Sequence, residues 1–323
     1  MGEFDLIKRY FQRENSTAHN GVILSIGDDC ALTQLSPEQQ LAVTTDTLVC
    51  GTHFLPTISP EDLAYKSVAV NLSDLAAMGA TPRWVSLALT LPEVDHCWLQ
   101  AFSRSLFDIL DRYNVSLIGG DTTKGSLSIT LTAQGALPQG QGLFRHQADI
   151  GDWIFVSGCL GDSAAGLALL LNPLHLPFNA SQAYCVERHL RPTPRVELGQ
   201  MLRAFSRCAI DISDGLLADL GHILKRSRCG AQLYLENLPL SEPLRANYSL
   251  AQAEKWALTG GEDYELCFTV AEQYRDEMEK TAQALGLSCH CIGRIVPLEQ
   301  GLTLWREGQE CPLPTHIGFD HFK

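Results

Sequence analysis

The chain has 323 residues, of which 45% are apolar and 19% are charged, a composition typical of globular proteins and not of disordered ones. Its 37 acidic residues outnumber its 24 basic residues and give a formal net charge of −13, which argues against nucleic acid or an anionic membrane surface as a partner. A chain of this length exceeds the usual span of one hydrophobic core, so we expect two domains.

The apolar runs and the cysteines indicate a cellular location. No apolar run approaches the length of a membrane span, and the first residues lack the basic and apolar regions of a secretory signal. The eleven cysteines follow no disulfide-framework spacing and form no Cys-x-x-Cys pair. We interpret them as reduced, small core residues and not as disulfides or zinc ligands. These features predict a cytoplasmic protein.

The first half of the chain alternates between strand and helix patterns. Phe4, Ile7 and Phe11 have helical spacing and predict a short first helix. Ser59, Pro60 and Asp62 form a helix start signal, with a capping serine, a proline at the first helical position and an acid three residues after the cap. The elements that we expect are strands at 41–49, 84–91, 115–118 and 127–133 and helices at 60–78 and 95–113.

A polar, glycine-rich segment at 138–151 is the candidate connection between the domains. We therefore expect an N-terminal domain at 1–147 and a C-terminal domain at 148–323. In the second domain the patterns predict strands at 152–157, 209–212, 231–237, 264–270 and 288–296, helices at 162–171, 215–227 and 272–285, and a loop with a short helix at 172–195. Strands and helices mixed in both halves predict an α/β or α+β fold for each domain.

Known phosphate-binding and catalytic motifs are absent. The sequence contains no P-loop, no G-x-G-x-x-G, no protein-kinase H-R-D and D-F-G pair, no G-x-S-x-G and no H-E-x-x-H. Any catalysis must therefore depend on a different arrangement of residues.

Aspartate occurs repeatedly beside glycine or hydroxyl residues. Alone, each such acid is more often a turn or helix-cap residue than a ligand. The acidic clusters lie at 26–29, 44–47, 71–74, 119–123, 211–215 and 260–263. Several of them end an apolar run, although aspartate is a poor strand former and a bare buried carboxylate is costly to desolvate.

Asp74 is harder to explain as a cap. The predicted helix from Ala64 to Met78 is almost entirely apolar, yet Ser67, Asn71 and Asp74 fall on one face of it. A polar stripe on a buried helix must face something polar, and the alternatives are a capped loop or a buried water network. If the acidic clusters share a cleft, they repel one another, and Mg²⁺ would relieve this because it accepts hard oxygen ligands and completes its shell with substrate phosphates. The clusters therefore predict a metal-bridged nucleotide site.

Taken in order, these motifs resemble those of the thiamine-monophosphate kinase family, which belongs with aminoimidazole ribonucleotide synthetase and selenophosphate synthetase. The resemblance extends from about Gly2 to Phe322 and depends on the segments IGDDCAL, TTDTLVCGTHF, NLSDLAAMGA, GGDTT, DISDGL, GGEDYEL and GFDHF. It implies a two-domain, aminoimidazole ribonucleotide synthetase-like fold. It also implies a homodimer in which N-terminal strands of the two subunits join in a barrel.

The activity that the resemblance implies is a kinase reaction in thiamine diphosphate biosynthesis, in which ATP phosphorylates thiamine phosphate in the presence of several Mg²⁺ ions. Carried over motif by motif, the metal ligands would be Asp29, Thr44, Thr45, Asp46, Asp74, Asp121, Asp211 and Asp214. ATP would contact Gly120, Asp121, Arg145 and Ser213, and thiamine phosphate would contact His53, Glu262 and Phe319. Two positions depart from the family pattern: Thr259 replaces an expected serine, and Phe319 stands where tyrosine or tryptophan is also familiar.

The residues themselves leave alternatives open at several of these positions. Arg145 is also compatible with a surface arginine on a connection, His53 with a packed or capping histidine, and Glu262 with an ordinary loop acid. A sister enzyme could use the same cleft to activate selenide or an amide oxygen, but residues 1–27 lack the cysteine expected of a selenophosphate synthetase. A third hypothesis is a cation-binding scaffold without catalysis.

The expected mechanism needs no general base. A phosphate monoester with a second pKa near ~6 is largely ionised at neutral pH, so the acceptor is already a nucleophile. Phosphoryl transfer depends mainly on positioning and charge neutralisation, which aspartates and Mg²⁺ can supply without a Ser/His/Asp triad. We therefore expect direct in-line transfer of the γ-phosphoryl group.

Overall fold

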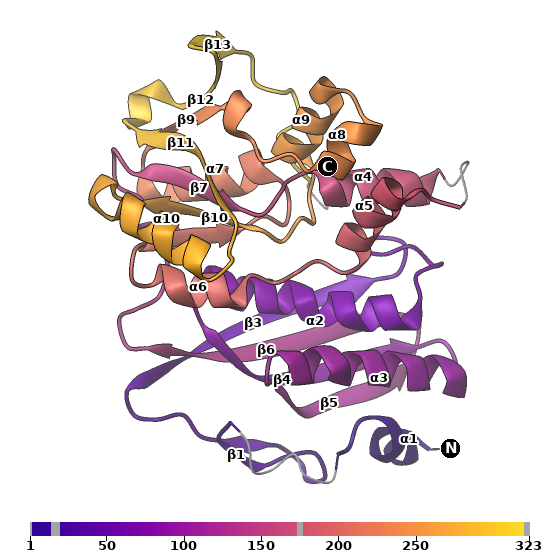
Figure 1. Ribbon diagram of the computed structural model, residues 1–323. Helices are drawn as coiled ribbons and strands as arrows, with labels where there is room; N and C mark the ends of the chain where they lie inside the picture. Colours follow the sequence, from indigo (N-terminus) through magenta and orange to yellow (C-terminus); the bar gives the residue numbers. More distant parts are fainter. Residues whose placement is uncertain (1, 14–19, 173–176, 320–323) are drawn as a thin grey trace. The chain divides into compact units, whose positions relative to one another are not determined.

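The computed structural model describes residues 2–13, 20–172 and 177–319 (Figure 1). The chain divides into two compact units, one made of Met1–Leu75 and Ala80–Gly140 and the other of Ala76–Gly79 and Gln141–Lys323. The passage from Gly140 to Gln141 lies within the polar, glycine-rich segment 138–151. Each unit combines helices with a β-sheet, so the predicted mixture of strands and helices in both halves is confirmed.

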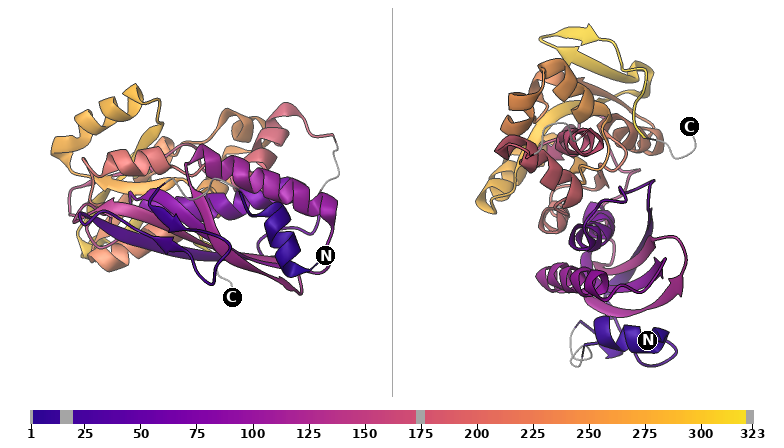
Figure 2. Two further views of the ribbon diagram at one scale, coloured as in Figure 1. Left: turned by 90° about the horizontal axis from the view of Figure 1, so that it is seen from below. Right: turned by 90° about the vertical axis from the view of Figure 1, so that its right-hand side faces the viewer.

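The first unit is built on a four-stranded sheet with the order β3-β6-β4-β5. The strands β4 and β5 are parallel, and the other pairs are antiparallel. Two long helices, α2 and α3, lie along one face of this sheet (Figures 1 and 2). The elements are α1 (Glu3–Tyr10), β1 (Val22–Leu24), β2 (Leu32–Thr33), β3 (Gln39–Val49), α2 (Pro60–Ala77), β4 (Thr81–Leu91), α3 (His96–Arg112), β5 (Ser116–Lys124) and β6 (Ser128–Pro138).

The helix α2 begins as the sequence predicts. The Ser59 hydroxyl accepts the backbone N–H of Asp62 at 3.0 Å, which satisfies one of the exposed donors of the first turn, and it donates to the Asp62 carboxylate at 2.7 Å. The helix ends at Ala77, and Gly79 follows in the left-handed region at φ +71°. Its apolar residues, including Leu72 and Leu75, are buried, so the helix supports the sheet from one side.

Four strands of the first unit are longer than predicted, and the first of them, β3, begins at Gln39. β4 begins at Thr81, β5 continues to Lys124, and β6 continues to Pro138. Residues after Ile118 have poor strand propensity, but they stay paired with β4 through the register from Ser86–Gly119 to Leu91–Lys124. The expectation that this strand ends at Ile118 is therefore wrong, because pairing with the neighbouring strand outweighs local propensity.

The second unit contains a seven-stranded sheet with the order β13-β12-β9-β11-β7-β10-β8. β12 is parallel to β9, and the other neighbours are antiparallel. The strands are β7 (Trp153–Ser157), β8 (Cys208–Asp211), β9 (Gly230–Tyr234), β10 (Leu266–Val270), β11 (Cys289–Val296), β12 (Leu302–Arg306) and β13 (Gln309–Cys311). Strands β12 and β13 were not predicted, and the strands expected at 231–237 and 264–270 are shorter, since a 3₁₀ turn occupies Leu235–Asn237 and β10 begins only at Leu266.

The helices of the second unit pack around this sheet and against one another. They are α4 (Asp162–Leu171), α5 (Ala180–Leu190), α6 (Val196–Leu202), α7 (Leu216–Ser227), α8 (Glu242–Asn247), α9 (Leu250–Thr259) and α10 (Arg275–Ala284), and further 3₁₀ turns lie at Glu272–Tyr274 and Leu298–Gln300. The apolar face of α7 packs into the main core with residues of β7, β8, β9 and β11. Residues 173–176 of the segment expected as a loop and short helix lie outside the described residues.

All eleven cysteines are free thiols, but only four of them are buried, so the expectation that they are core residues is wrong for the other seven. Cys30 and Cys97 are exposed, whereas the buried thiols belong to the second unit: Cys185, Cys208, Cys229 and Cys267. Burial raises the pKa of Cys208 to about 12, so this thiol stays protonated at neutral pH. Among the described helices, none has the length and apolar character that crossing a bilayer requires.

Candidate active site

An acidic pair lies between β3 and α2 in the first unit. Thr44 and Asp46 alternate along β3 and so point to the same face of the strand, toward α2. The hydroxyl of Thr44 donates to the carboxylate of Asp74 on α2. Burial, and after it the negative charge of Asp74, raises the pKa of Asp46 to about 6. Asp74 of the predicted polar stripe therefore faces the acid and the hydroxyl of a neighbouring strand, whereas the side chains of Ser67 and Asn71 donate to backbone carbonyl groups of their own helix.

Thr45 points to the other face of the same strand. Its hydroxyl lies 2.9 Å from the hydroxyl of Thr132 on β6, and the next outward pair, Thr47 and Thr130, repeats this contact at 2.9 Å. Strand alternation thus separates Thr45 from its neighbours Thr44 and Asp46. The structure does not bring the side chain of Thr45 to the Asp74 carboxylate.

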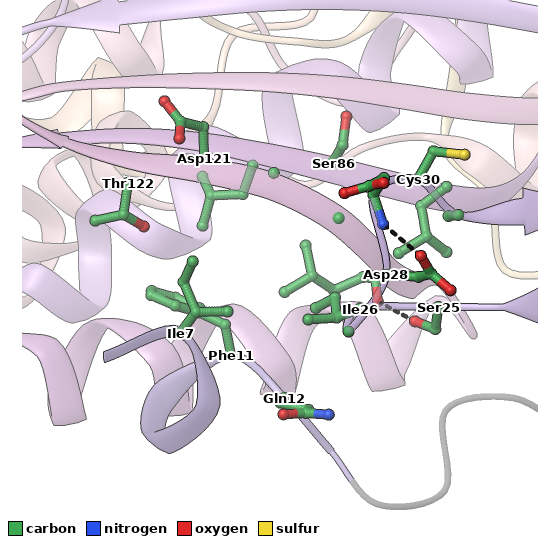
Figure 3. Close-up of a pocket in the computed structure, with 18 of the residues that line it drawn as sticks. Ile7, Phe11, Gln12, Ser25, Ile26, Asp28, Cys30, Ser86, Asp121 and Thr122 are labelled. Atoms are coloured by element: carbon green, nitrogen blue, oxygen red, sulfur yellow. Dashed lines mark hydrogen bonds between the residues drawn. The ribbon is translucent and has the colours of Figure 1, made fainter. Parts of the chain in front are cut away.

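A cavity of about 790 Å³ lies in the first unit beside β5 and the segment 25–31. Figure 3 shows Ile7 of α1 and Phe11, which follows this helix, on one side of this cavity and Asp121 and Thr122 of β5 on the other. The predicted residues Asp29, Gly120 and Asp121 line it together. The cavity therefore combines an apolar wall with an edge of carboxylates and glycine backbone, the mixture expected of a site for a small polar ligand with an apolar ring.

Gly120 is required by the close approach of two strands. Its φ is +151°, and a Cβ at this position would overlap the carbonyl oxygen of Leu87 on β4. Gly119 has no atom within 4 Å of the equivalent position. The glycine pair of the GGDTT motif thus contains one residue that the backbone demands and one that leaves space open at the cavity.

In the second unit, the acidic loop after β8 is organised by a residue that the sequence analysis missed. The carboxylate of Asp219 accepts the backbone N–H groups of Ser213, Asp214 and Gly215 at 3.0, 3.0 and 3.1 Å. Burial raises the pKa of Asp219 to about 7, although these hydrogen bonds oppose the rise. Asp211 is the last residue of β8, one residue before the predicted end of this strand, and is 3% exposed. The spacing of Asp219 from its loop, one turn into α7, is the signal that could have identified it.

The predicted substrate residue Glu262 lies on a loop with unusual backbone geometry. Glu262 and Tyr264 have φ of +67° and +50°, a left-handed conformation that is uncommon for residues other than glycine. Two hydrogen bonds hold this loop against the loop after β8: the N–H of Glu262 donates to Ser213 O at 2.8 Å, and the N–H of Tyr264 donates to Ile212 O at 2.9 Å. The structure therefore brings Glu262 next to Ser213, as the motif order predicts.

The C-terminal segment is attached to the same loop. The N–H of Phe319 donates to Asp214 O at 3.0 Å, and a side chain at Gly318 would lie 2.8 Å from that oxygen. Phe319 is exposed, with 55% of the residue's surface accessible. Phe319, Asp214, Ser213 and Glu262 are thus neighbours, while Asp320 to Phe322 of the GFDHF motif lie outside the described residues.

Two further predicted residues lie on connections. His53 follows β3, and its Nδ1 accepts the backbone N–H of Val49 at 3.0 Å. This contact is the capping role that the sequence left open as an alternative to substrate binding. Arg145 is exposed in the segment between β6 and β7, where its carbonyl oxygen accepts the Ser227 hydroxyl at 2.9 Å. The guanidinium is therefore exposed on a connection whose backbone is fixed.

The predicted metal ligands are distributed over the two units. Asp29, Asp46, Asp74 and Asp121 belong to the first unit, and Asp211 and Asp214 belong to the second. Within the described ranges, no three His, Cys, Asp or Glu side chains form a ready-made metal site. The donor set nevertheless suits Mg²⁺, which is usually held by one or two carboxylates together with water and substrate phosphates. Burial, and after it the negative charge of Asp74, raises the pKa of Asp46, and a bound cation would oppose both effects.

Comparison with protein families assigns both units. The N-terminal domain of the AIR synthase related proteins matches residues 27–137, and the C-terminal domain of the same family matches residues 149–303. The chain therefore belongs to the AIR synthase related family, and the predicted two-domain fold of this family is confirmed.

Within that family, the chain belongs with the thiamine-monophosphate kinases. It is 56% identical to the thiamine-monophosphate kinase of Haemophilus influenzae, with an alignment that covers 100% of this chain and 98% of the relative. The crystal structure of a thiamine-monophosphate kinase from Stenotrophomonas maltophilia is 46% identical, with a TM-score of 0.84, and covers 91% of this chain and 93% of that one. A structure of AaThiL complexed with AMPPCP and TMP is 31% identical, has a TM-score of 0.78, and covers 99% of this chain and 96% of that one.

Proposed function

We propose that this protein is a kinase that transfers the γ-phosphoryl group of ATP to thiamine phosphate and forms thiamine diphosphate and ADP. The observation that carries this proposal is the similarity, along the whole chain, to thiamine-monophosphate kinases and to a relative complexed with AMPPCP and TMP. AMPPCP is an ATP analogue whose β–γ bridge is a methylene group, so its presence with TMP matches the two substrates proposed for this chain.

The chemistry of the site agrees with this reaction. Thiamine phosphate supplies an acceptor oxygen that is largely ionised at neutral pH, because the second pKa of a phosphate monoester is about 6. The protein has to bring two anions into line and offset their repulsion, which needs no side chain as a general base. We propose direct in-line transfer without a phosphorylated enzyme. Net inversion at a chiral phosphorus would support this, and net retention would contradict it.

The proposed roles of individual residues are described for the first unit and then for the second. In the first unit, Gly120 and Asp121 contact ATP at the edge of the cavity, and in the second unit Ser213 and Arg145 do so. His53, Glu262 and Phe319 bind thiamine phosphate. The proposed Mg²⁺ ligands are Asp29, Thr44, Thr45, Asp46, Asp74, Asp121, Asp211 and Asp214, with Thr45 contributing a backbone atom because its hydroxyl is paired with Thr132. When bound, Mg²⁺ neutralises the charge of the phosphates against these carboxylates.

We also propose a homodimer in which the open face of the first unit's sheet joins its copy in a barrel. Leu41 and Val43 project from the edge strand β3 on this face and are 51% and 57% exposed. A long exposed edge strand with apolar side chains is a liability for a monomer and is usually covered. A cytoplasmic location is proposed as well, because free thiols in these numbers suit a reducing compartment.

The test is an assay of the purified protein with ATP, Mg²⁺ and thiamine phosphate. Appearance of thiamine diphosphate and ADP in equal amounts supports the proposal. ATP turnover only with selenide or an amide acceptor would assign the chain to a sister activity. Absence of turnover with every acceptor would leave a cation-binding scaffold and contradict the kinase function.

A further inference from the structure

A buried histidine stands behind Glu262 and has no role in the function described above. His189 lies on α5, is 3% exposed, and places its Nδ1 atom 3.0 Å from the Ser163 hydroxyl and 3.5 Å from Oε2 of Glu262. The Glu262 side chain is 26% exposed, so its carboxylate has one side open to solvent and another backed by an imidazole. Ser163, His189 and Glu262 all belong to the second unit.

The position of His189 is fixed by the contact between α4 and α5. A Cβ at Gly166 of α4 would overlap the carbonyl oxygen of Cys185 and would lie 3.0 Å from the Cβ of His189. The absence of a side chain at Gly166 therefore lets the two helices approach closely and brings the imidazole of α5 to the hydroxyl of Ser163 on α4.

The loop that carries Glu262 is held to the same end of α4. The carboxylate of Asp263 is buried and accepts the N–H of Gly161 at 2.7 Å and the N–H of Ser163 at 3.2 Å. Ser163 thus contacts the loop through its backbone and His189 through its hydroxyl. A left-handed residue such as Glu262 has a backbone that its surroundings must hold in place, and this arrangement holds its side chain as well.

We propose that His189 is a positioning residue that orients the Glu262 carboxylate toward thiamine phosphate, with its single Nδ1–H shared between the carboxylate and the hydroxyl oxygen of Ser163, which fixes the imidazole ring. This inference rests on the proposed function, in which Glu262 binds that substrate. The 3.5 Å separation shortens when the substrate binds, as polar contacts in unliganded sites commonly do. His189 touches neither substrate and acts only through Glu262.

The test compares His189→Ala with His189→Asn, whose amide nitrogen can replace Nδ1 as a donor. We expect His189→Ala to raise the KM for thiamine phosphate about 10-fold, the usual scale for a lost hydrogen bond to a charged group, and His189→Asn to raise it only about 2-fold. The KM for ATP stays within about 2-fold of the parent in both, since no ATP contact changes. Ser163→Ala provides a second route to the same effect if His189→Ala does not fold. His290→Ala is the matched control, because His290 forms a comparable pair with Ser288 at 2.8 Å.

The deciding measurement is a double-mutant cycle with Glu262→Gln, followed by calorimetric binding of thiamine phosphate. If His189 acts through Glu262, adding His189→Asn or His189→Ala to Glu262→Gln weakens binding no further. Additive losses, or an equal rise in the KM for ATP, would overturn the inference and leave His189 as a core residue. Failure of the parent protein to phosphorylate thiamine phosphate would instead defeat the proposed function, so the two failures are distinguishable.

Discussion

Asp46 and Asp74 illustrate how a pair of side chains can oppose folding while serving the proposed metal site. Burial and the neighbouring charge raise the pKa of Asp46 to about 6, so near neutral pH two carboxylates repel each other between β3 and α2. A raised folded-state pKa contributes stability below the unfolded value, and that contribution is lost as pH rises through about 6. Near neutral pH, where a bound cation would need both carboxylates ionised, the pair therefore lowers the free energy of unfolding.

Replacing Asp74 with asparagine should separate these two effects. We expect Asp74→Asn to lower turnover by about 100-fold or more, the scale for loss of a group that stabilises transferred charge, while the free energy of unfolding without metal is unchanged or increased. Steady-state assays and chemical denaturation near neutral pH check both parts. Asp276→Asn, on the exposed surface of α10, is the control and should change neither quantity. Near-parental activity of Asp74→Asn would refute the ligand role.

Asp263 predicts a pH dependence of stability. Burial raises its pKa from an ordinary value of 3.8 to about 7, against the opposing effect of hydrogen bonds from Gly161 and Ser163. Folding therefore takes up a proton at Asp263, and its contribution to the free energy of unfolding falls as pH rises from about 4 to about 7. Denaturation of the parent and of Asp263→Asn across this range should show a difference between them that changes with pH. A difference that stays constant from pH 4 to 8 would falsify the assignment.

At the scale of elements, the junction of β4 and β5 depends on one glycine. A Cβ at Gly120 would overlap the Leu87 carbonyl oxygen, whereas one at Gly119 would meet no atom within 4 Å. We expect Gly120→Ala to reduce the free energy of unfolding by about 2–4 kcal/mol through displacement of backbone at the cavity. Gly119→Ala is the adjacent control, and its unfolding free energy should stay within about 0.5 kcal/mol of the parent. Equal effects of the two substitutions would contradict this account of the junction.

The same elements show what the sequence alone could predict. Helices α2 and α3 were predicted almost to their ends because Ser59 and Asp95 are capping residues whose side chains accept the first backbone donors. Helices α8 and α9 also begin with capping serines, Ser241 and Ser249, but they are short and were missed because their apolar periodicity is weak. Strand β5 was predicted too short because only its pairing with β4 keeps Gly119 to Lys124 extended.

The candidate site was predictable to the extent that its residues occur in local motifs. Thr44, Asp46 and Asp74 occur in the quoted motifs, and strand alternation explains why Thr44 and Asp46 share a face of β3. Asp219 was missed although it lies only a few residues after the loop that it holds, whereas His189 was missed because its contact with Glu262 depends on how helices pack. Fold-level contacts of this kind leave no spacing signal in the sequence.

For the molecule as a whole, the open sheet face predicts the oligomeric state. Val43→Asp places a charge at the centre of an apolar edge that we propose is covered by a second copy, so the variant should be monomeric under conditions where the parent is dimeric. Analytical ultracentrifugation at several concentrations measures this. Val94→Asp, at a position 49% exposed before α3, is the control and should leave the dimer intact. A parent protein that is monomeric at all concentrations would end the barrel proposal.

The net charge of the whole molecule affects how it binds ATP. With a formal charge of −13, the protein repels a triphosphate unless cations intervene. The proposed enzyme should therefore bind ATP measurably only when Mg²⁺ is present, and added chelator should abolish turnover and release nucleotide together.

The distribution of exposed and buried thiols allows unfolding of the second unit to be followed by alkylation. Cys185, Cys208, Cys229 and Cys267 are hidden inside one unit, and burial keeps the thiol of Cys208 protonated. An alkylating reagent meets Cys30 and Cys97 at once but reaches the hidden four only when that unit unfolds, in part or completely. Mass increments after a brief pulse of reagent would thus time the exposure of the C-terminal core, with no engineered probe added.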